Sequence, residues 1–314
     1  MSTRERTREA AASAANASDA VRGAGASDGS EATLTYVYAV GRDDGALRGA
    51  VGRLTGVDGH ELRLIGGDGH GDGDGGGGGG GDGGGLVALV SPVPADVFGE
   101  SALRARMEDL GRLEELARAH HAVIDAAFAE TVVLPLRLAT VYLDERRVVA
   151  MLTEQRLPFE QLLAELDGHV ELGVKVYADP ASATRHAAAS PPESPAAPAS
   201  PGRAYLAQRR AQRLGTQDLY RAAGDIAAEA RRAAEALSRA RAVHRPQQGE
   251  LSRQRGENLS NEAYLVPAEE VDRFRERVGA LALRAPGVHV EVTGPWAPYS
   301  FATPEMGGDE GAPR

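Results

Sequence analysis

Apolar residues alternate with polar or small residues in several short segments of the chain, a period typical of half-buried β-strands. The alternation predicts strands over Leu34–Val40, Glu61–Ile65, Leu86–Ser91, Val132–Leu138, His169–Tyr177, Ala263–Val266 and Val288–Val292, with a shorter one near Gly249–Ser252. Pro135 lies inside one of these segments, and proline lacks the backbone donor of a sheet ladder. We therefore expect that strand at a sheet edge or at a bulge.

Between the strands, apolar residues three and four positions apart predict helices. The expected helices are Ala46–Leu54, Ser101–Phe128 with Ser101 as its N-cap, Glu145–Leu166, Arg203–His244 and Pro267–Leu283. The elements then follow the order strand, helix, strand, strand, helix, strand twice along the chain, which is the order of ferredoxin-like domains. The predicted fold class is therefore α+β, with two ferredoxin-like domains of the βαββαβ type and long helices.

Several segments have too few large apolar residues to form a core. The tract at 66–85 contains fifteen glycines, four aspartates and one histidine, and tracts of this composition are typical of flexible insertions. The predicted disordered segments are an N-terminal extension at 1–31, the glycine-rich insertion at 66–85, a Pro/Ala/Ser-rich linker at 180–201 and a tail at 305–314. They leave an N-terminal domain over 32–167 and a C-terminal domain over 168–304.

Composition limits the classes of function. With 35 basic and 45 acidic residues the net charge is -10, which argues against a protein that binds nucleic acid as a whole. The chain has no cysteine, so disulfides, thiolate metal sites and cysteine nucleophiles are excluded. No apolar run approaches the roughly 20 residues of a transmembrane helix, and residues 1–31 lack the apolar region of a secretory signal. We expect a cytoplasmic protein that binds neither nucleic acid nor a lipid membrane.

The adjacent pair His120 and His121 is the most evident metal candidate. Neighbouring positions on a helix point about 100° apart, so the two rings cannot chelate one ion as residues four apart would. His120 falls on the apolar stripe of its predicted helix, and we interpret it as a hydrogen-bonded core histidine. No metal, cofactor or catalytic residue is predicted.

Two basic residues in predicted strands have two interpretations each. Arg137 follows Pro135 between two leucines and, if buried, needs a carboxylate partner; we favour a structural arginine over one that contacts a partner protein. Lys175 lies between Val174 and Val176, so its side chain faces away from theirs and reaches solvent or a polar partner. For Lys175, too, we favour a structural role over contact with a partner protein.

The predicted helix from Arg203 is unusually basic. From Arg203 to Arg245 the chain has ten arginines and four acidic residues. A solvated arginine face on a helix that covers a sheet explains this composition. A docking surface for an acidic partner, with Arg209 and Arg213 among its residues, is the functional alternative. Nucleic acid is a weaker third alternative, because no aromatic residues are interleaved with the arginines.

The segment Thr293–Phe301 holds the single tryptophan of the chain, Trp296, with Tyr299 and Phe301. Because Gly294 and Pro295 interrupt the strand pattern, we expect the sheet to end before them. The three rings either fold back onto the core of the C-terminal domain or form an exposed patch that receives an apolar segment of a partner. We favour the first alternative.

These motifs together resemble a known family. In order along the chain they include Tyr36-Val-Tyr38, Leu134-Pro-Leu-Arg-Leu-Ala-Thr140, Gly173-Val-Lys-Val-Tyr177, Asn261-Glu-Ala-Tyr-Leu-Val266 and the aromatic segment ending at Phe301. Their order resembles that of the GvpF/GvpL family of gas vesicle proteins, from Tyr36 to Phe301. The resemblance implies two α+β domains and a non-enzymatic accessory or minor shell component. It also implies the small apolar shell protein GvpA and other gas vesicle accessory proteins as partners, and a location at gas vesicles in the cytoplasm.

The leading hypothesis is therefore a binding protein that keeps GvpA from aggregating and supports vesicle nucleation and formation. The rival hypothesis is a ligand-sensing or enzymatic ferredoxin-like protein, because this fold hosts many activities. An enzyme needs convergent polar groups in a pocket and an activity that survives without any shell protein.

Overall fold

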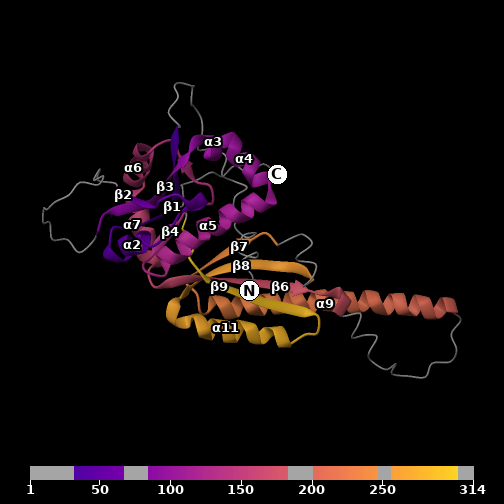
Figure 1. The fold of residues 1–314 in the computed structure, drawn as a ribbon. Coiled ribbons are helices and arrows are strands. Elements are labelled where there is room, and N and C mark those ends of the chain that lie inside the picture. The colour runs from indigo at the N-terminus through magenta and orange to yellow at the C-terminus, as the bar shows by residue number, and fades with distance from the viewer. Residues whose placement is uncertain (1–31, 67–83, 183–200, 247–255, 303–314) are drawn as a thin grey trace. The chain divides into compact units, whose positions relative to one another are not determined.

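The computed structural model describes residues 32–66, 84–182, 201–246 and 256–302, and all structural statements concern these residues. The chain divides into two compact units (Figure 1). The first unit comprises Met1–Asp167 and Ala297–Arg314, and the second comprises Gly168–Trp296. The predicted disordered segments and the short strand near Gly249–Ser252 lie mainly or wholly outside the described residues.

The first unit is built on a five-stranded antiparallel sheet. Its order is β2-β3-β1-β4, and β5 also pairs with β1. The strands are β1 (Thr33–Arg42), β2 (Arg63–Gly66), β3 (Leu86–Pro94), β4 (Val133–Pro135) and β5 (Val141–Tyr142). The strand predicted over Val132–Leu138 ends at Pro135, which lies on the edge strand β4 as proline requires.

Both faces of this sheet are buried, which explains why β1 has an almost unbroken run of buried residues. On one face Tyr36 and Tyr38 join the core cluster with Leu116 and Ile124 of α5 (Leu110–Phe128). Val37, Val40 and other strand residues are equally buried but lie outside that cluster. The helices α6 (Glu145–Glu154) and α7 (Arg156–Leu166) contact β2, β3 and β4.

The helix predicted over Ser101–Phe128 is wrong as a single element. Two helices occupy this range, α4 (Glu100–Glu108) and α5, after the short α3 (Ala95–Phe98). Asp109 separates them, because its backbone is extended and its carboxylate accepts hydrogen bonds from the amides of Gly111 and Arg112. Asp109 is therefore the N-cap of α5, whereas Ser101 lies inside α4 and is not a cap. The first helix of the unit, α2 (Gly45–Val51), is capped by Asp44 in the same way.

The second unit repeats the plan of the first. Its four-stranded sheet has the order β7-β8-β6-β9, with β6 (His169–Ala178), β7 (Ala240–His244), β8 (Glu257–Pro267) and β9 (Val288–Trp296). One face packs against α9 (Pro201–Glu235) and α11 (Val271–Gly279), which is flanked by the short helices η3 (Ala268–Glu270) and η4 (Ala280–Leu283). Leu172, Ile226, Tyr264 and Phe274 are central in this core.

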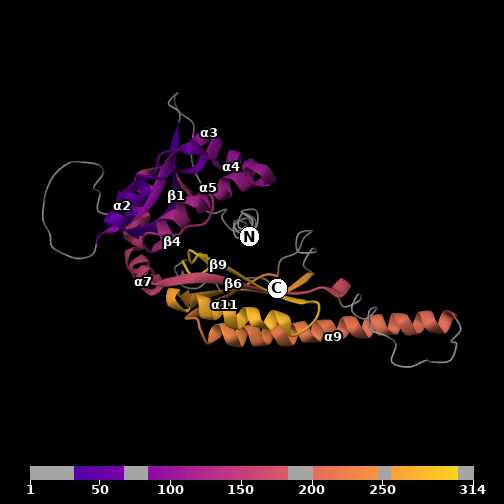
Figure 2. The same cartoon turned by 60° about the horizontal axis from the view of Figure 1, so that its bottom comes forward.

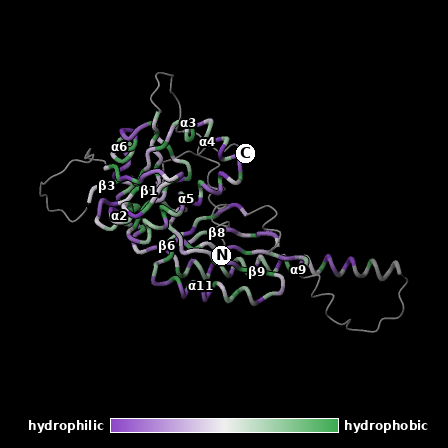
Figure 3. The backbone as a smooth tube through the Cα atoms, viewed as in Figure 1, coloured by the Kyte–Doolittle hydropathy of each residue, from purple (hydrophilic) through white to green (hydrophobic). Residues whose placement is uncertain are grey.

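Both units have the βαββαβ element order, and in both sheets the first strand lies between the third and the fourth. This is the ferredoxin-like arrangement, so the predicted fold class is confirmed for each unit. Figure 3 shows the hydrophobic residues, in green, recurring along the strands and the helices packed on them.

Two predicted ends in the second unit are wrong. The helix expected to reach His244 ends at Glu235, and Ala240–His244 forms the edge strand β7. No glycine or proline marks the end of that helix, so the strand arises from its pairing with β8. The strand β9 does not end at Val292 but continues to Trp296, which pairs with Glu171 across a register shift. Its position at the sheet edge explains how Pro295 is tolerated.

Gly294 permits this continuation, since its φ of 102° lies in the region that favours glycine. A Cβ there would lie 2.6 Å from the carbonyl oxygen of Glu171. Gly294→Ala is therefore expected to lower the free energy of unfolding of the second unit by about 1–3 kcal/mol. Urea unfolding followed by the fluorescence of Trp296 measures this, and Gly279→Ala, where nothing lies within 4 Å, is the control. An equal effect of the two substitutions would contradict the expectation.

The C-terminal boundary of the second domain also needs correction. We expected it at residue 304, but the division of the chain lies after Trp296. Ala297, which is only 1% exposed, belongs to the core cluster of the first unit, and Tyr299 packs against the same cluster. The end of the described chain therefore completes the N-terminal core.

Candidate functional site

His120 is buried in a closed hydrogen-bond network of the first unit. Its Nε2 lies 3.2 Å from the carbonyl oxygen of Leu136, which can only accept, so Nε2 carries the proton. Its Nδ1 then accepts from the hydroxyl of Tyr36 at 3.0 Å, and that hydroxyl accepts in turn from the amide of Ala139. Burial lowers the pKa of His120 to about 3 and raises that of Tyr36. The interpretation of His120 as a hydrogen-bonded core histidine is confirmed.

The aromatic residues near the C-terminus have different positions. Tyr299 lies against the core cluster of the first unit, with its ring centroid 5.2 Å from that of His121. Phe301 is half-buried in the same unit, and Trp296 is half-buried on β9 of the second. Packing of these rings as a group on the C-terminal core is therefore wrong for Tyr299, which packs on the N-terminal one.

Arg137 does not have the buried structural position that we favoured. The strand ends at Pro135, and Leu136–Thr140 forms a turn in which the carbonyl of Arg137 accepts from the amide and hydroxyl of Thr140. Its side chain is exposed, and no carboxylate among the described residues pairs with it. Arg137 is therefore available to a partner rather than committed to the fold.

Lys175 has the predicted orientation. Val174 and Val176 belong to the core of the second unit, and Lys175 points to the opposite face of the sheet. It is only 3% exposed, and its backbone pairs with Asn261 on one side and Glu291 on the other. Lys175 is thus enclosed, which makes it a poor candidate for contacting a partner.

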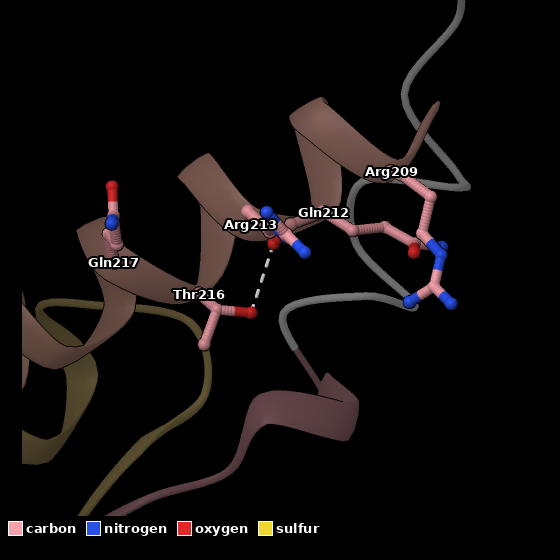
Figure 4. A pocket seen from close by; sticks show the side chains of 5 residues that line it. All are labelled: Arg209, Gln212, Arg213, Thr216 and Gln217. Carbon is pink, nitrogen blue, oxygen red and sulfur yellow. Dashed lines mark hydrogen bonds between the residues drawn. The ribbon is translucent and has the colours of Figure 1, made fainter. Parts of the chain in front are cut away.

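Arg209 and Arg213 lie together on α9. With Gln212, Thr216 and Gln217 they line an open hollow of about 500 Å³ (Figure 4). Thr216 donates its hydroxyl hydrogen to the carbonyl of Gln212 at 2.9 Å, so this hydroxyl is oriented by the helix itself. The hollow offers guanidinium and amide groups. Arg209 and Arg213 are the two predicted site residues that line it.

The three polar residues beside the arginines were not predicted from the sequence. The signal was present, because the five positions follow from Arg209 at steps of three, four, seven and eight residues. Positions at these steps share one face of a helix. The arginine content of the helix alone does not indicate this polar face.

Two ion-pair groups that sequence reasoning missed stabilise the units. In the first, Arg106 forms two hydrogen bonds of 2.6 Å with Asp58, which lowers the pKa of that carboxyl. In the second, the carboxylate of Glu262 is 5% exposed and accepts from Arg231 and Arg241. The partners lie far apart in sequence, so no local pattern indicates either group.

Among the described residues, no group of three or more histidine, cysteine or acidic side chains is placed to hold a metal ion. The helices that the structure describes include none both long and apolar enough to cross a membrane. The predicted site residues that the structure brings together are Arg209 and Arg213, beside the hollow of α9.

Comparison with known proteins gives these residues a context. A family model described as "Gas vesicle synthesis protein GvpL/GvpF" matches residues 34–303. The chain belongs to the GvpL/GvpF family. The predicted resemblance is confirmed, and the family is one of gas vesicle proteins.

Two curated relatives come from Streptomyces sp. (strain CB03234). "Gas vesicle protein L" is 45% identical over 277 residues, covering 86% of this chain and 92% of the relative. "Gas vesicle protein F" is 30% identical over 223 residues, covering 69% and 84%. Within this pair the chain is more similar to the L protein.

Solved structures of the family share the fold. The crystal structure of GvpF from Microcystis aeruginosa has a TM-score of 0.51 and 18% identity, covering 86% of this chain and 99% of that one. For GvpF from Anabaena sp. PCC7120 the values are 0.55 and 17%, with coverage of 86% and 96%. At this identity the likeness concerns the fold alone, two antiparallel sheets with helices.

Proposed function

We propose that this protein is an L-type gas vesicle assembly factor that binds the apolar shell protein GvpA without catalysing a reaction. The observation that carries the proposal is the family match, which extends over residues 34–303. The higher identity to the L relative, 45% against 30%, supports the L type. We place the protein in the cytoplasm and at gas vesicles, in contact with further accessory proteins.

Physical chemistry supports a chaperone-like role. An apolar shell subunit aggregates in water because its association removes apolar surface from solvent. A partner that covers this surface transiently and carries a net charge of -10 keeps the complex soluble by repulsion between complexes. This role requires no nucleophile, base or metal, and the protein can remain as a minor shell component.

Half-buried aromatic residues are the contacts we propose for the shell protein. Trp296 and Phe301 are each half-buried, and aromatic residues are frequent anchors of protein interfaces. Tyr299 is omitted from this contact because it packs on a core. Arg137, which is exposed, is a separate candidate for a polar contact with a partner.

Co-expression with the GvpA homologue of the same genome tests the proposal. We expect the shell protein to become soluble and to co-purify. Trp296→Ala is expected to weaken co-purification more than about tenfold, because loss of an anchoring tryptophan removes about 2 kcal/mol or more of binding free energy. Leu157→Ala, at a residue 69% exposed on α7, is the control and should change binding less than about twofold.

The proposed function is wrong if the shell protein aggregates equally with and without this protein and no complex forms. If binding survives in Trp296→Ala while the fold is intact by circular dichroism, the function stands and the aromatic contact does not. Phe301→Ala and Arg137→Glu then locate the contact.

A further inference from the structure

The helix α9 extends well past the elements that it covers in the second unit. Figures 1 and 2 both show its N-terminal part running beyond β6, β8, β9 and α11. Among the described residues, Leu219 is the first on this helix to belong to the core. The stretch 201–217, about 25 Å long at 1.5 Å per residue, is called the α9 arm below.

The face of α9 that packs on the sheet changes character at the start of the core. From Leu219 onward it consists of residues such as Ala223, Ile226 and Ala230, all buried. In the arm, Gln212 and Thr216 lie near the continuation of this face, and Arg209, Arg213 and Gln217 lie on the side of the helix next to it. Polar side chains therefore lie on and beside the line of the apolar face where the helix leaves its own unit, and Figure 3 shows hydrophilic residues in this region of α9.

The arm concentrates positive charge in an acidic protein. Residues 201–217 include four arginines and no aspartate or glutamate, whereas the chain carries a net charge of -10. Arg209, Arg210 and Arg213 are exposed, and within the described residues neither Arg210 nor Arg213 pairs with a carboxylate. Elsewhere on the same helix arginines are neutralised, as Arg221 is by Asp218 at 3.0 Å.

We propose that the α9 arm is a docking surface for an acidic helix of another protein. The polar face has the three- and four-residue steps at which one helix packs along another. Its guanidinium groups bind carboxylates with charge-assisted hydrogen bonds, and its amides and hydroxyl add polar contacts. Leu206 and Leu214, 66% and 52% exposed, supply apolar contacts beside this face.

The same features disfavour other occupants. An apolar shell segment would leave the arginines and glutamines of the arm without water or polar partners, which costs free energy. Two arms of the same protein would repel each other, because both are positive. A nucleic acid would have to approach a chain with a net charge of -10. The acidic partner is therefore distinct from GvpA, and the inference does not depend on the function proposed above.

Fluorescence anisotropy with the full-length protein tests the arm. The probe is a fluorescein-labelled 20-residue helical peptide of Ala, Leu and Glu, with Glu at three- and four-residue steps. We expect saturable binding that weakens when NaCl rises from about 50 to 300 mM. A peptide with Gln in place of every Glu should bind at least about tenfold more weakly.

Matched variants separate the arm from net charge. Arg209→Glu with Arg213→Glu is expected to weaken peptide binding at least about tenfold. The control, Arg112→Glu with Arg277→Glu, makes the same charge change at exposed arginines on α5 and α11, and is expected to stay within about twofold. A peptide with Lys in place of Glu should recover binding to the arm variant.

Equal binding of the Glu and Gln peptides would overturn the proposal, as would equal weakening by the two double variants. Tighter binding of a 20-base-pair DNA duplex than of the peptide, lost in the arm variant, would show instead that the arm binds nucleic acid. The arm contains none of the described core residues, and Arg112 and Arg277 are exposed, so both double variants should retain the wild-type unfolding transition.

Discussion

Glu262→Ala is expected to lower the free energy of unfolding of the second unit by about 2–3 kcal/mol. The carboxylate of Glu262 is 5% exposed and accepts from Nε and Nη2 of Arg231 at 3.0 and 2.8 Å. It also accepts from Arg241 at 3.1 Å and from the hydroxyl of Tyr264 at 2.5 Å. One side chain thus joins α9, β7 and β8.

The expected magnitude depends on the groups that lose their partner when the carboxylate is removed. Removing one member of a buried ion pair costs about 3–5 kcal/mol when the other charge stays buried. Arg231 and Arg241 are 44% and 31% exposed, so water replaces part of the lost interaction, and the estimate falls to about 2–3 kcal/mol. Tyr264 loses its acceptor, which adds the cost of a buried unpaired hydroxyl.

Urea unfolding followed by the fluorescence of Trp296 isolates this effect, because the single tryptophan lies on β9 of the second unit. Asp218→Ala, which breaks the exposed pair with Arg221, is the control and should change stability by less than about 1 kcal/mol. A Glu262→Ala transition coincident with the wild-type curve would show that the cluster contributes nothing. Glu262→Gln keeps the shape of the side chain and one acceptor oxygen. Its free energy of unfolding is expected to lie between those of the wild type and Glu262→Ala.

The element order was predictable because hydrophobic periodicity is local. Alternation over His169–Tyr177 and three- and four-residue steps from Leu219 to Leu237 reflect faces that the structure buries. With two such series in the same order, the ferredoxin-like arrangement follows from short connections alone.

The predicted ends of α9 and β9 are wrong because segments distant in sequence determine the structure there. Ala240–His244 contains good helix formers and no stop signal, and it becomes a strand only because β8 lies beside it. The strand β9 passes Gly294 and Pro295 because its outer edge is free of a ladder partner in its own sheet. Asp109 is the exception, since an aspartate before an apolar helical run is a local N-cap signal.

The candidate site was predictable only in part. Charge composition indicated Arg209 and Arg213, and helical spacing placed them on one face. The exposure of Arg137 and the enclosure of Lys175 depend on turns and strand pairing that one segment does not encode. The sequence also does not indicate that Tyr299 packs on the N-terminal core, because the chain after Trp296 belongs to the first unit again.

The first unit is expected to lose stability as the pH falls from 6.5 to 4.5. Burial lowers the pKa of His120 to about 3 in the folded protein, whereas the side chain in the unfolded chain titrates near 6.5. Between these values the unfolded state binds a proton that the folded state does not, so acid favours unfolding. Above about pH 7.5 both states are neutral at this residue and the contribution is constant.

The slope approaches about 1.4 kcal/mol per pH unit below pH 6.5, and because the unfolded-state histidine is only half protonated at pH 6.5, the expected loss over this interval is about 2 kcal/mol. Asp58, whose pKa is lowered by Arg106, contributes mainly below this window, because its stabilisation is lost as the pH falls from the unfolded-state pKa of a carboxyl, about 4, through the lower folded pKa. Scanning calorimetry at pH 6.5, 5.5 and 4.5 measures the loss, and thermal unfolding followed by the fluorescence of Trp296 reports on the second unit for comparison.

His120→Gln is the informative variant, because an amide can still donate to the carbonyl of Leu136 and accept from Tyr36 but cannot titrate. It is expected to be less stable than the wild type at pH 7 and to lose most of the pH dependence of the first unit between 6.5 and 4.5. His121→Gln leaves His120 in place and should keep that dependence. If His120→Gln and the wild type lose stability in parallel, the proton is taken up elsewhere, and the buried network is not what makes the first unit sensitive to acid.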